Sequence, residues 1–153
     1  MKHYFGRLRA GLIALAAFAS FGVAMSGLPA AAAEMTVYKT LSCGCCTKWV
    51  DHLEENGFEV TVHSVDDLSP VKSRLGVPQT LQSCHTAEID GYVIEGHVPA
   101  EDIRRLLDER PDATGIAVPG MPVGSPGMEY GDRKDAYDVI LFGDGEQETY
   151  ATH

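Results

Sequence analysis

The sequence has few basic residues: 12 Lys and Arg face 22 Asp and Glu, which gives the 153-residue chain a formal net charge of −10. It also has no run of Lys or Arg. A protein that binds nucleic acid needs basic patches to neutralise phosphates, so we expect no nucleic-acid partner. The same deficit argues against binding to an anionic membrane surface and leaves cation binding open.

Cysteine is scarce as well. Four cysteines in a chain of this size are too few for a disulfide-dense scaffold. The composition, 44% hydrophobic and 22% charged, is typical of a globular protein. The length fits one domain of ordinary size. Three of the four cysteines fall within residues 43–46, which is an unusual spacing.

The first 33 residues predict an export signal. Three basic residues occur within the first nine, an apolar stretch covers residues 11–28, and small residues at positions 30–33 precede Glu34, the first acid. This order is that of a secretory signal peptide, so we expect Sec-type export to the periplasm with cleavage near Ala33. The alternative is an uncleaved anchor, because 18 apolar residues are at the short edge of a membrane span.

Residues 34–153 would then form the mature domain. Removing the signal takes away three basic residues and no acid, so the net charge of the mature chain becomes −13. We expect no stable membrane insertion after cleavage. Metal or disulfides would be acquired outside the cytoplasm.

The hydrophobic pattern of the first half predicts alternating strands and helices. Residues 35–40 and 58–65 alternate between apolar and polar side chains and predict strands. Between them, an apolar stripe at i, i+3, i+4 and i+7 from Cys46 predicts a helix that ends at Gly57. Ser69-Pro70 predicts the start of a short second helix.

The second half begins with a predicted hairpin. Asp90-Gly91 joins residues 83–89 to residues 92–98, and both turn residues can adopt the positive φ that a two-residue connection needs. Residues 99–110 predict a third helix, with acids near its start and a proline after its end. The order β-α-β-α-β-β-α predicts an α/β fold of the thioredoxin-like type, with the cysteines between the first strand and the first helix.

A C-terminal extension follows. Residues 117–131 are rich in Pro, Gly and Met, and residues 138–142 and 148–152 predict a terminal hairpin. Met121 and Met128 lie in the turn-rich part. Their thioethers are soft, neutral donors that suit Cu(I) and not zinc, although ordinary packing is the alternative role of methionine.

The cysteine cluster contains a C-x-x-C pair, Cys43 and Cys46, with Cys45 between them. Unpaired N–H groups and the positive dipole end at a helix start lower the pKa of a thiol. A plain C-x-x-C pair would predict thiol–disulfide exchange. The third thiol complicates that interpretation, because Cys45 could resolve a disulfide with either partner.

The fourth cysteine, Cys84, is placed by counting. In thioredoxin-like folds the loop that faces the cysteine pair lies about seven residues before the hairpin turn, so we expect Cys84 and His85 to face residues 43–46. Four converging thiolates favour a soft metal, and bridging thiolates favour several Cu(I) ions over one tetrahedral zinc. Structural disulfides and thiol–disulfide redox chemistry remain alternatives. His97 lies between the hairpin and the third helix, where it would be either a ligand or a cap, and we expect the structural role.

At this point the sequence resembles the periplasmic copper-resistance proteins of the CopG type. The resemblance covers residues 35–150 and rests on four ordered motifs: residues 42–46, residues 83–87, residues 91–99, and residues 120–122 with 124–128. It implies a thioredoxin-like fold that holds a cysteine-bridged, multinuclear copper cluster.

The resemblance also implies a role in copper resistance, with Cu(I) bound and with interconversion between Cu(I) and Cu(II). The implied partners are copper ions and other periplasmic copper-resistance proteins. The implied ligands are the thiolates of Cys43, Cys45, Cys46 and Cys84. His85, Met121 and Met128 match family motifs and are expected as supporting ligands.

Overall fold

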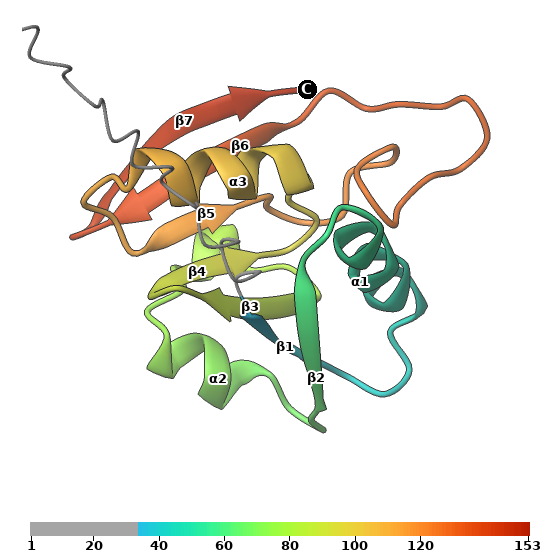
Figure 1. Cartoon of the computed structure of the whole chain (residues 1–153), viewed down its shortest axis with the longest axis horizontal. Helices are drawn as coiled ribbons and strands as arrows, with labels where there is room; N and C mark the ends of the chain where they lie inside the picture. Colours follow the sequence, from blue (N-terminus) through green and yellow to red (C-terminus); the bar gives the residue numbers. More distant parts are fainter. Residues whose placement is uncertain (1–33) are drawn as a thin grey trace, which may run out of the picture. The chain divides into compact units, whose positions relative to one another are not determined.

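The computed structural model describes residues 34–153; the predicted export signal, residues 1–33, lies outside the described residues. The described part is a mixed α/β fold with a seven-stranded sheet and three α-helices (Figure 1). Its elements in chain order are β1 (Glu34–Lys39), α1 (Gly44–Glu55), β2 (Glu59–Ser64), α2 (Ser69–Arg74), a 3-10 turn (Gln79–Leu81), β3 (His85–Ile89), β4 (Tyr92–Glu95), α3 (Ala100–Glu109), β5 (Gly115–Ala117), β6 (Asp138–Gly143) and β7 (Glu146–Thr152).

The strands lie in the order β2-β1-β3-β4-β5-β6-β7. The pairs β1/β2 and β4/β5 are parallel, and the other neighbouring pairs are antiparallel. The predicted order β-α-β-α-β-β-α is confirmed, and so is the α/β class; its thioredoxin-like character stays a prediction.

Strand β5 was not predicted from the sequence. It has three residues, which is too short for a recognisable alternation. It begins with Gly115, where a Cβ atom would lie 1.9 Å from the carbonyl oxygen of Val93. The glycine therefore allows β5 to approach β4 closely. Because glycine has no side chain, this approach leaves no hydrophobic pattern in the sequence from which the strand could be predicted.

Helix α1 buries the predicted face, formed by Cys46, Trp49, Val50 and Leu53. Trp49 donates from Nε1 to the carbonyl oxygen of Val98 at 2.8 Å, so its buried polar group is satisfied. The helix begins at Gly44, two residues before the predicted stripe. As a result two of the clustered cysteines lie in the first helical turn rather than in a loop.

The predicted hairpin is confirmed. Asp90 and Gly91 have φ values of 49° and 88°, and β3 pairs with β4 so that Thr86 lies opposite Glu95. Strand β4 ends at Glu95, so the final predicted residues of that strand belong to the connection to α3. The terminal hairpin of β6 and β7 is also confirmed.

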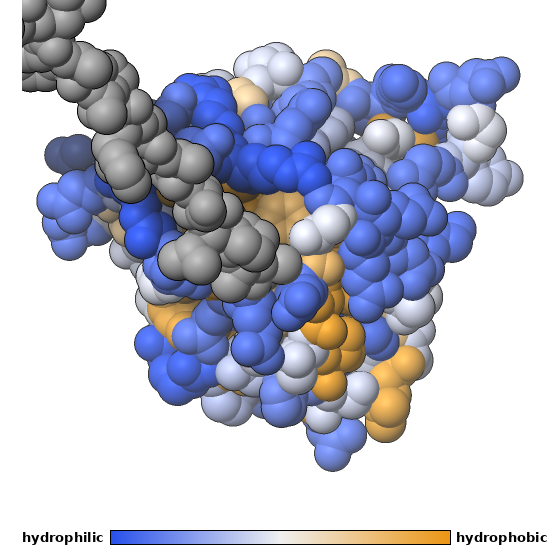
Figure 2. Space-filling model, viewed as in Figure 1, coloured by the Kyte–Doolittle hydropathy of each residue, from blue (hydrophilic) through white to orange (hydrophobic). Residues whose placement is uncertain are grey.

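The sheet separates two hydrophobic clusters. Val93 and Ile94 are neighbours in β4, yet they belong to different clusters because successive strand residues point to opposite faces. Residues of α1 and α3 pack in the larger cluster with Ile94, and Leu75, next to α2, packs against the smaller one. The face shown in Figure 2 is mostly hydrophilic, with small apolar areas between the polar side chains. Within residues 34–153, no helix has the length and apolarity required to cross a membrane.

Candidate metal centre

The four cysteine sulfurs lie together. One ligand atom from each of Cys43, Cys45, Cys46 and Cys84 lies within 4.8 Å of all the others. The sheet register explains the convergence: β1 leads directly into the Cys43 turn, and its last residue Lys39 pairs with His85, the residue after Cys84. The predicted meeting of the two segments is therefore produced by antiparallel β1/β3 pairing.

Two of these sulfurs are bonded to each other. Cys43 and Cys46 form a disulfide with Cα atoms 5.4 Å apart, and Cys45 and Cys84 are free, partly buried thiols. The Cys45 sulfur lies 3.5 Å from that of Cys43. A disulfide sulfur cannot act as a thiolate ligand, so the bond between Cys43 and Cys46 must be reduced before four thiolates can bind a metal.

Cys84 also meets two imidazoles. Its sulfur lies 3.1 Å from Nε2 of His97 and 3.4 Å from Nδ1 of His85, and these three residues form a second group that could hold a metal ion. Cys84 thus belongs to both groups and connects the four sulfurs to the two rings.

The tautomer of His97 follows from its other contact. Nδ1 lies 2.8 Å from the carbonyl oxygen of Pro126, and because a carbonyl only accepts, Nδ1 carries the proton and donates it. Burial lowers the pKa of His97, which keeps the ring neutral. Nε2 therefore directs a lone pair at Cys84, in the orientation that a metal-ligating histidine requires.

His85 is fully buried, as His97 is, but its hydrogen bonding is less complete. Its ring centroid lies 4.2 Å from that of Trp49 and 4.9 Å from that of His97, and its Nε2 has no hydrogen-bond partner among the described residues. Burial first, and then the neighbouring His97 and Lys72, hold the pKa of His85 well below 6.5. An unpaired buried nitrogen costs about 1–3 kcal/mol, which is more typical of a functional site than of a structural one.

The thiol of Cys84 is protonated in this environment. Burial first, and then the proximity of Cys45, raise the pKa of Cys84 to about 12. The predicted lowering of thiol pKa at the helix start does not extend to Cys84, which precedes β3. A metal ion that binds here must therefore displace the Cys84 proton.

A second polar group holds the Cys84 loop from the other side of the hairpin. The carboxylate of Glu95, fully buried, accepts from the Ser83 backbone N–H at 2.6 Å and from Lys72 Nζ at 2.5 Å, and Thr86 donates to it at 2.7 Å. Sequence reasoning missed this group. Its signal is a single acid directly after the apolar residues 92–94 of the predicted strand.

The two methionines lie in different places. Met128 lines a depression together with Cys45, and the adjacent Gly127 packs on α1 so closely that a Cβ atom there would lie 2.7 Å from the Cys45 carbonyl oxygen. Met121 is 53% exposed and lines a separate depression with Tyr137. The structure therefore brings Met128, but not the Met121 side chain, to the edge of the cysteine cluster.

The structural role expected for His97 agrees with its hydrogen bond to Pro126, and its contact with Cys84 fits the alternative role of a ligand. The sequence contains a signal for this contact. The hairpin register that pairs Thr86 with Glu95, when extended by two residues, places Cys84 opposite His97.

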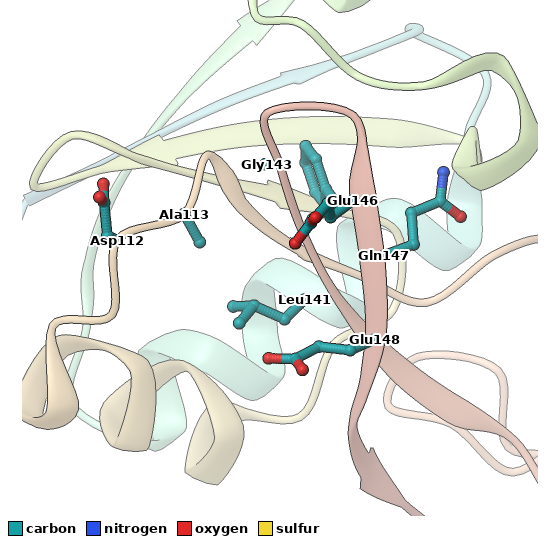
Figure 3. Close-up of a pocket in the computed structure, with 8 residues that line it drawn as sticks. Asp112, Ala113, Leu141, Gly143, Glu146, Gln147 and Glu148 are labelled. Atoms are coloured by element: carbon teal, nitrogen blue, oxygen red, sulfur yellow. The ribbon is translucent and has the colours of Figure 1, made fainter.

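A further depression lies beside the β6–β7 hairpin (Figure 3) and has a volume of about 420 Å³. Its carboxylates, Asp112, Glu146 and Glu148, do not converge on one point in the figure, and they are not among the described groups whose ligand atoms lie within 4.8 Å. Neither cysteine nor histidine lines it. This depression lacks the soft donors of the cysteine cluster.

Comparisons with known proteins give one matching family model and two similar solved structures. A family model described as "Protein of unknown function, DUF411" matches residues 81–128. A solved structure titled "Copper resistance protein copG- Form 2" is 54% identical, covers 80% of this chain and 98% of its own, and superposes with a TM-score of 0.77. A second, titled "Copper resistance protein copG- Form 1", is 55% identical, covers 78% and 96%, and has a TM-score of 0.75. No curated protein sequence matches significantly. With this identity over nearly the full length of both solved structures, the chain belongs to the CopG family of copper resistance proteins.

Proposed function

We propose that this protein binds Cu(I) in the periplasm through the thiolates of Cys43, Cys45, Cys46 and Cys84, and that it acts in copper resistance. The observation that carries the proposal is the convergence of four sulfurs within 4.8 Å of one another beside a histidine whose Nε2 lone pair is directed at Cys84. Four sulfurs and neutral imidazoles form a soft donor set, which favours Cu(I).

The positions of the cysteines favour several copper ions over one zinc ion. Cys45 and Cys46 are consecutive residues of α1, so their side chains leave the helix about 100° apart, given 3.6 residues per turn. Two such sulfurs do not readily complete one tetrahedron, whereas they can bridge neighbouring ions. The proposed site is therefore multinuclear and bridged by thiolates.

The remaining donors differ in how close they lie to the cysteine cluster, and we propose correspondingly different contributions to copper binding. His97 supplies Nε2 at the Cys84 end, and His85 lies beside the same sulfur. Met128 is placed at the Cys45 end and can add a thioether. Met121 would have to turn its exposed side chain toward the cluster in order to contribute. Interconversion of bound Cu(I) and Cu(II) is part of the proposal, with the electron passing to or from an external one-electron carrier, because a thiolate cluster beside imidazoles offers ligands for both states.

The direct test is anaerobic Cu(I) titration of the fully reduced protein, followed by metal analysis and copper-edge X-ray absorption. We expect more than one copper per chain, sulfur as the main ligand, and a short copper–copper distance. Cys84→Ser should lower the stoichiometry, with Ser42→Ala as the matched control beside the cluster. Tight binding of one zinc and no copper would contradict the proposal.

The location is tested separately. We propose cleavage near Ala33 and release of residues 34–153 into the periplasm, where other copper-resistance proteins are the proposed partners. The mass of the protein purified from the periplasmic fraction should match a chain that begins at Glu34. A full-length chain recovered from the membrane fraction would support the uncleaved anchor instead.

A second candidate function is thiol–disulfide exchange, and the disulfide between Cys43 and Cys46 at the start of α1 is the observation that favours it. In that function the protein would reduce a model disulfide such as insulin with electrons from an added dithiol. Cys46→Ser should abolish this turnover, and Met128→Leu should not affect it. Absence of turnover with any dithiol would exclude this candidate.

A further inference from the structure

A depression opens onto the cysteine cluster at Cys45, and we call it the Cys45 depression. It lies between α1 and the loop that connects β5 to β6, which run side by side in Figure 1. Its volume is about 570 Å³, within the range of small-molecule sites. The residues that matter to the argument are Cys45, Lys48, Val123, Met128, Tyr130 and Arg133.

The wall of the depression is apolar. Val123, Met128 and Tyr130 line it, and Tyr130 is 75% exposed, among the most exposed large apolar residues of 34–153. An exposed aromatic residue is a ready surface for stacking with a flat ligand. Cys45, a free and partly exposed cysteine, lines the same depression.

The rim is positive, although residues 34–153 carry a net charge of −13. Lys48 and Arg133 line the depression, and neither forms an ion pair with any residue between 34 and 153. Four other cations do form ion pairs, namely Lys72, Arg74, Arg105 and Arg110. Unpaired cations are thus present at the opening of the cluster.

One carboxylate also lines the depression. Glu129 accepts a hydrogen bond from the Gly127 backbone N–H at 2.9 Å, and this bond from a neutral amide leaves its negative charge in place. Asp135, which does not line the depression, accepts one from the Val123 N–H at 3.2 Å. The two cations, Lys48 and Arg133, therefore outnumber the lining carboxylate by one charge.

We propose that the Cys45 depression docks a small, anionic complex of Cu(I) with an aromatic or apolar ligand, and that this complex delivers copper through Cys45. The proposal rests on the proposed copper-binding function and adds to it the chemical class of the donor. The apolar wall packs against the ligand, and Lys48 and Arg133 bind its negative groups. Repulsion by distant acids is weak because charges more than about 8 Å apart are screened at physiological ionic strength.

Copper stays as Cu(I) in this transfer. A bond between copper and its carrier ligand breaks, a bond between copper and the Cys45 sulfur forms, and the thiol proton leaves to solvent. The carrier ligand departs with its negative charge. No oxidant or reductant takes part, because the protein enters the reaction with the disulfide between Cys43 and Cys46 already reduced.

The test compares two aromatic carriers of opposite charge. Reduced, full mature protein is mixed with the anionic Cu(I) complex of bicinchoninate or with the cationic Cu(I) complex of neocuproine, and the loss of carrier absorbance gives the transfer rate. For Lys48→Glu/Arg133→Glu we expect transfer from the anionic carrier to slow about tenfold or more, the lower end of steering effects by local charge. Transfer from the cationic carrier should not slow.

The matched control is Arg74→Glu/Arg110→Glu, which makes the same change in charge at two exposed cations that do not line the depression. It should leave the ratio of the two rates within about twofold of the original, as expected for surface charges beyond the screening length. The proposal would be overturned if copper transfer from both carriers slowed equally, or if transfer from the anionic carrier did not slow. Either result would also apply if the natural donor were an acidic protein instead of a small complex. If the unaltered reduced protein accepts copper from neither carrier, the copper-binding function itself fails.

Discussion

Two polar groups occupy opposite faces of the β3–β4 hairpin, and they differ in how completely they are satisfied. On the α2 face, Lys72, Thr86 and Glu95 bond to one another, and the Glu95 carboxylate also holds the Ser83 N–H. On the α1 face, His85 has an unpaired Nε2, and its Nδ1 faces the sulfur of Cys84.

This difference in hydrogen bonding indicates that the group on the α2 face has a structural role and the group on the α1 face a functional one. Every polar atom of a satisfied buried group has a partner, so the group stabilises one backbone arrangement. An unsatisfied group lowers stability and persists where it has another use. The Glu95 group therefore positions the Cys84 loop, and the Cys84–His85–His97 group retains free donor capacity for a metal.

The largest expected effect comes from breaking the satisfied group. Glu95→Gln leaves the Lys72 charge buried without its counter-charge, so the free energy of unfolding should fall by about 3–5 kcal/mol. Urea denaturation of the reduced, metal-free protein measures this change. The double variant Lys72→Met/Glu95→Gln removes the isolated charge and should recover much of the loss. If the free energy of unfolding of Glu95→Gln fell by less than about 1 kcal/mol, the Lys72–Glu95 pair would be solvated. The contrast between a satisfied group on the α2 face and an unsatisfied group on the α1 face would then be wrong.

On the other face, the expected loss is in copper affinity rather than stability. His97→Asn retains an amide donor near Nδ1 for Pro126 and removes the Nε2 atom that faces Cys84. Cu(I) affinity should fall by about 10–100-fold, measured by competition with bicinchoninate. His97→Gln, which places a side-chain atom near the Nε2 position, is the control and should lose less. Unchanged affinity in His97→Asn would show that the histidine is structural.

The unsatisfied group should also impart a pH dependence to stability. The pKa of His85 in the folded protein is lowered, chiefly by burial, so the unfolded chain binds more protons as the pH falls below 6.5. The stability contributed by neutral His85 is complete above pH 6.5 and is lost as the pH falls from there toward the folded pKa. Urea denaturation of the metal-free protein between pH 7.5 and pH 5 should show this decline. His85→Gln should flatten it, and an identical slope in that variant would exclude His85 as its source.

The smallest expected effect distinguishes the two methionines. Met128→Leu removes a thioether beside Cys45 and should weaken Cu(I) affinity by a few-fold, about 0.5–1 kcal/mol, in the range of weak sulfur contacts. Met121→Leu should weaken it less, because the Met121 side chain is exposed in another depression. Competition titrations under identical conditions compare the two. A larger loss for Met121→Leu would show that its loop closes over the cluster when copper binds.

Much of the site could be predicted from the sequence. The C-x-C-C pattern, the Asp-Gly turn and the position of Cys84 before that turn were sufficient to bring the four cysteines together, because each is a local signal or a short count from one. The contact of His97 with Cys84 could also have been predicted, by counting outward from the Asp-Gly turn along the two strands of the hairpin. Strand β5 was not, because a three-residue strand with a leading glycine has no periodic pattern.

The sequence by itself determined the donor chemistry and the charge of this protein. Sulfur is a soft donor and imidazole a borderline one whatever the fold, and the excess of acid is a property of composition. Only the tertiary structure decided how these donors are arranged. It set the His97 tautomer through Pro126, 29 residues away, and it placed Met128 rather than Met121 beside Cys45. It also joined Lys72 to Glu95 behind the Cys84 loop. The physical reason is that these contacts join residues distant in sequence, and local backbone preference does not specify which atoms meet.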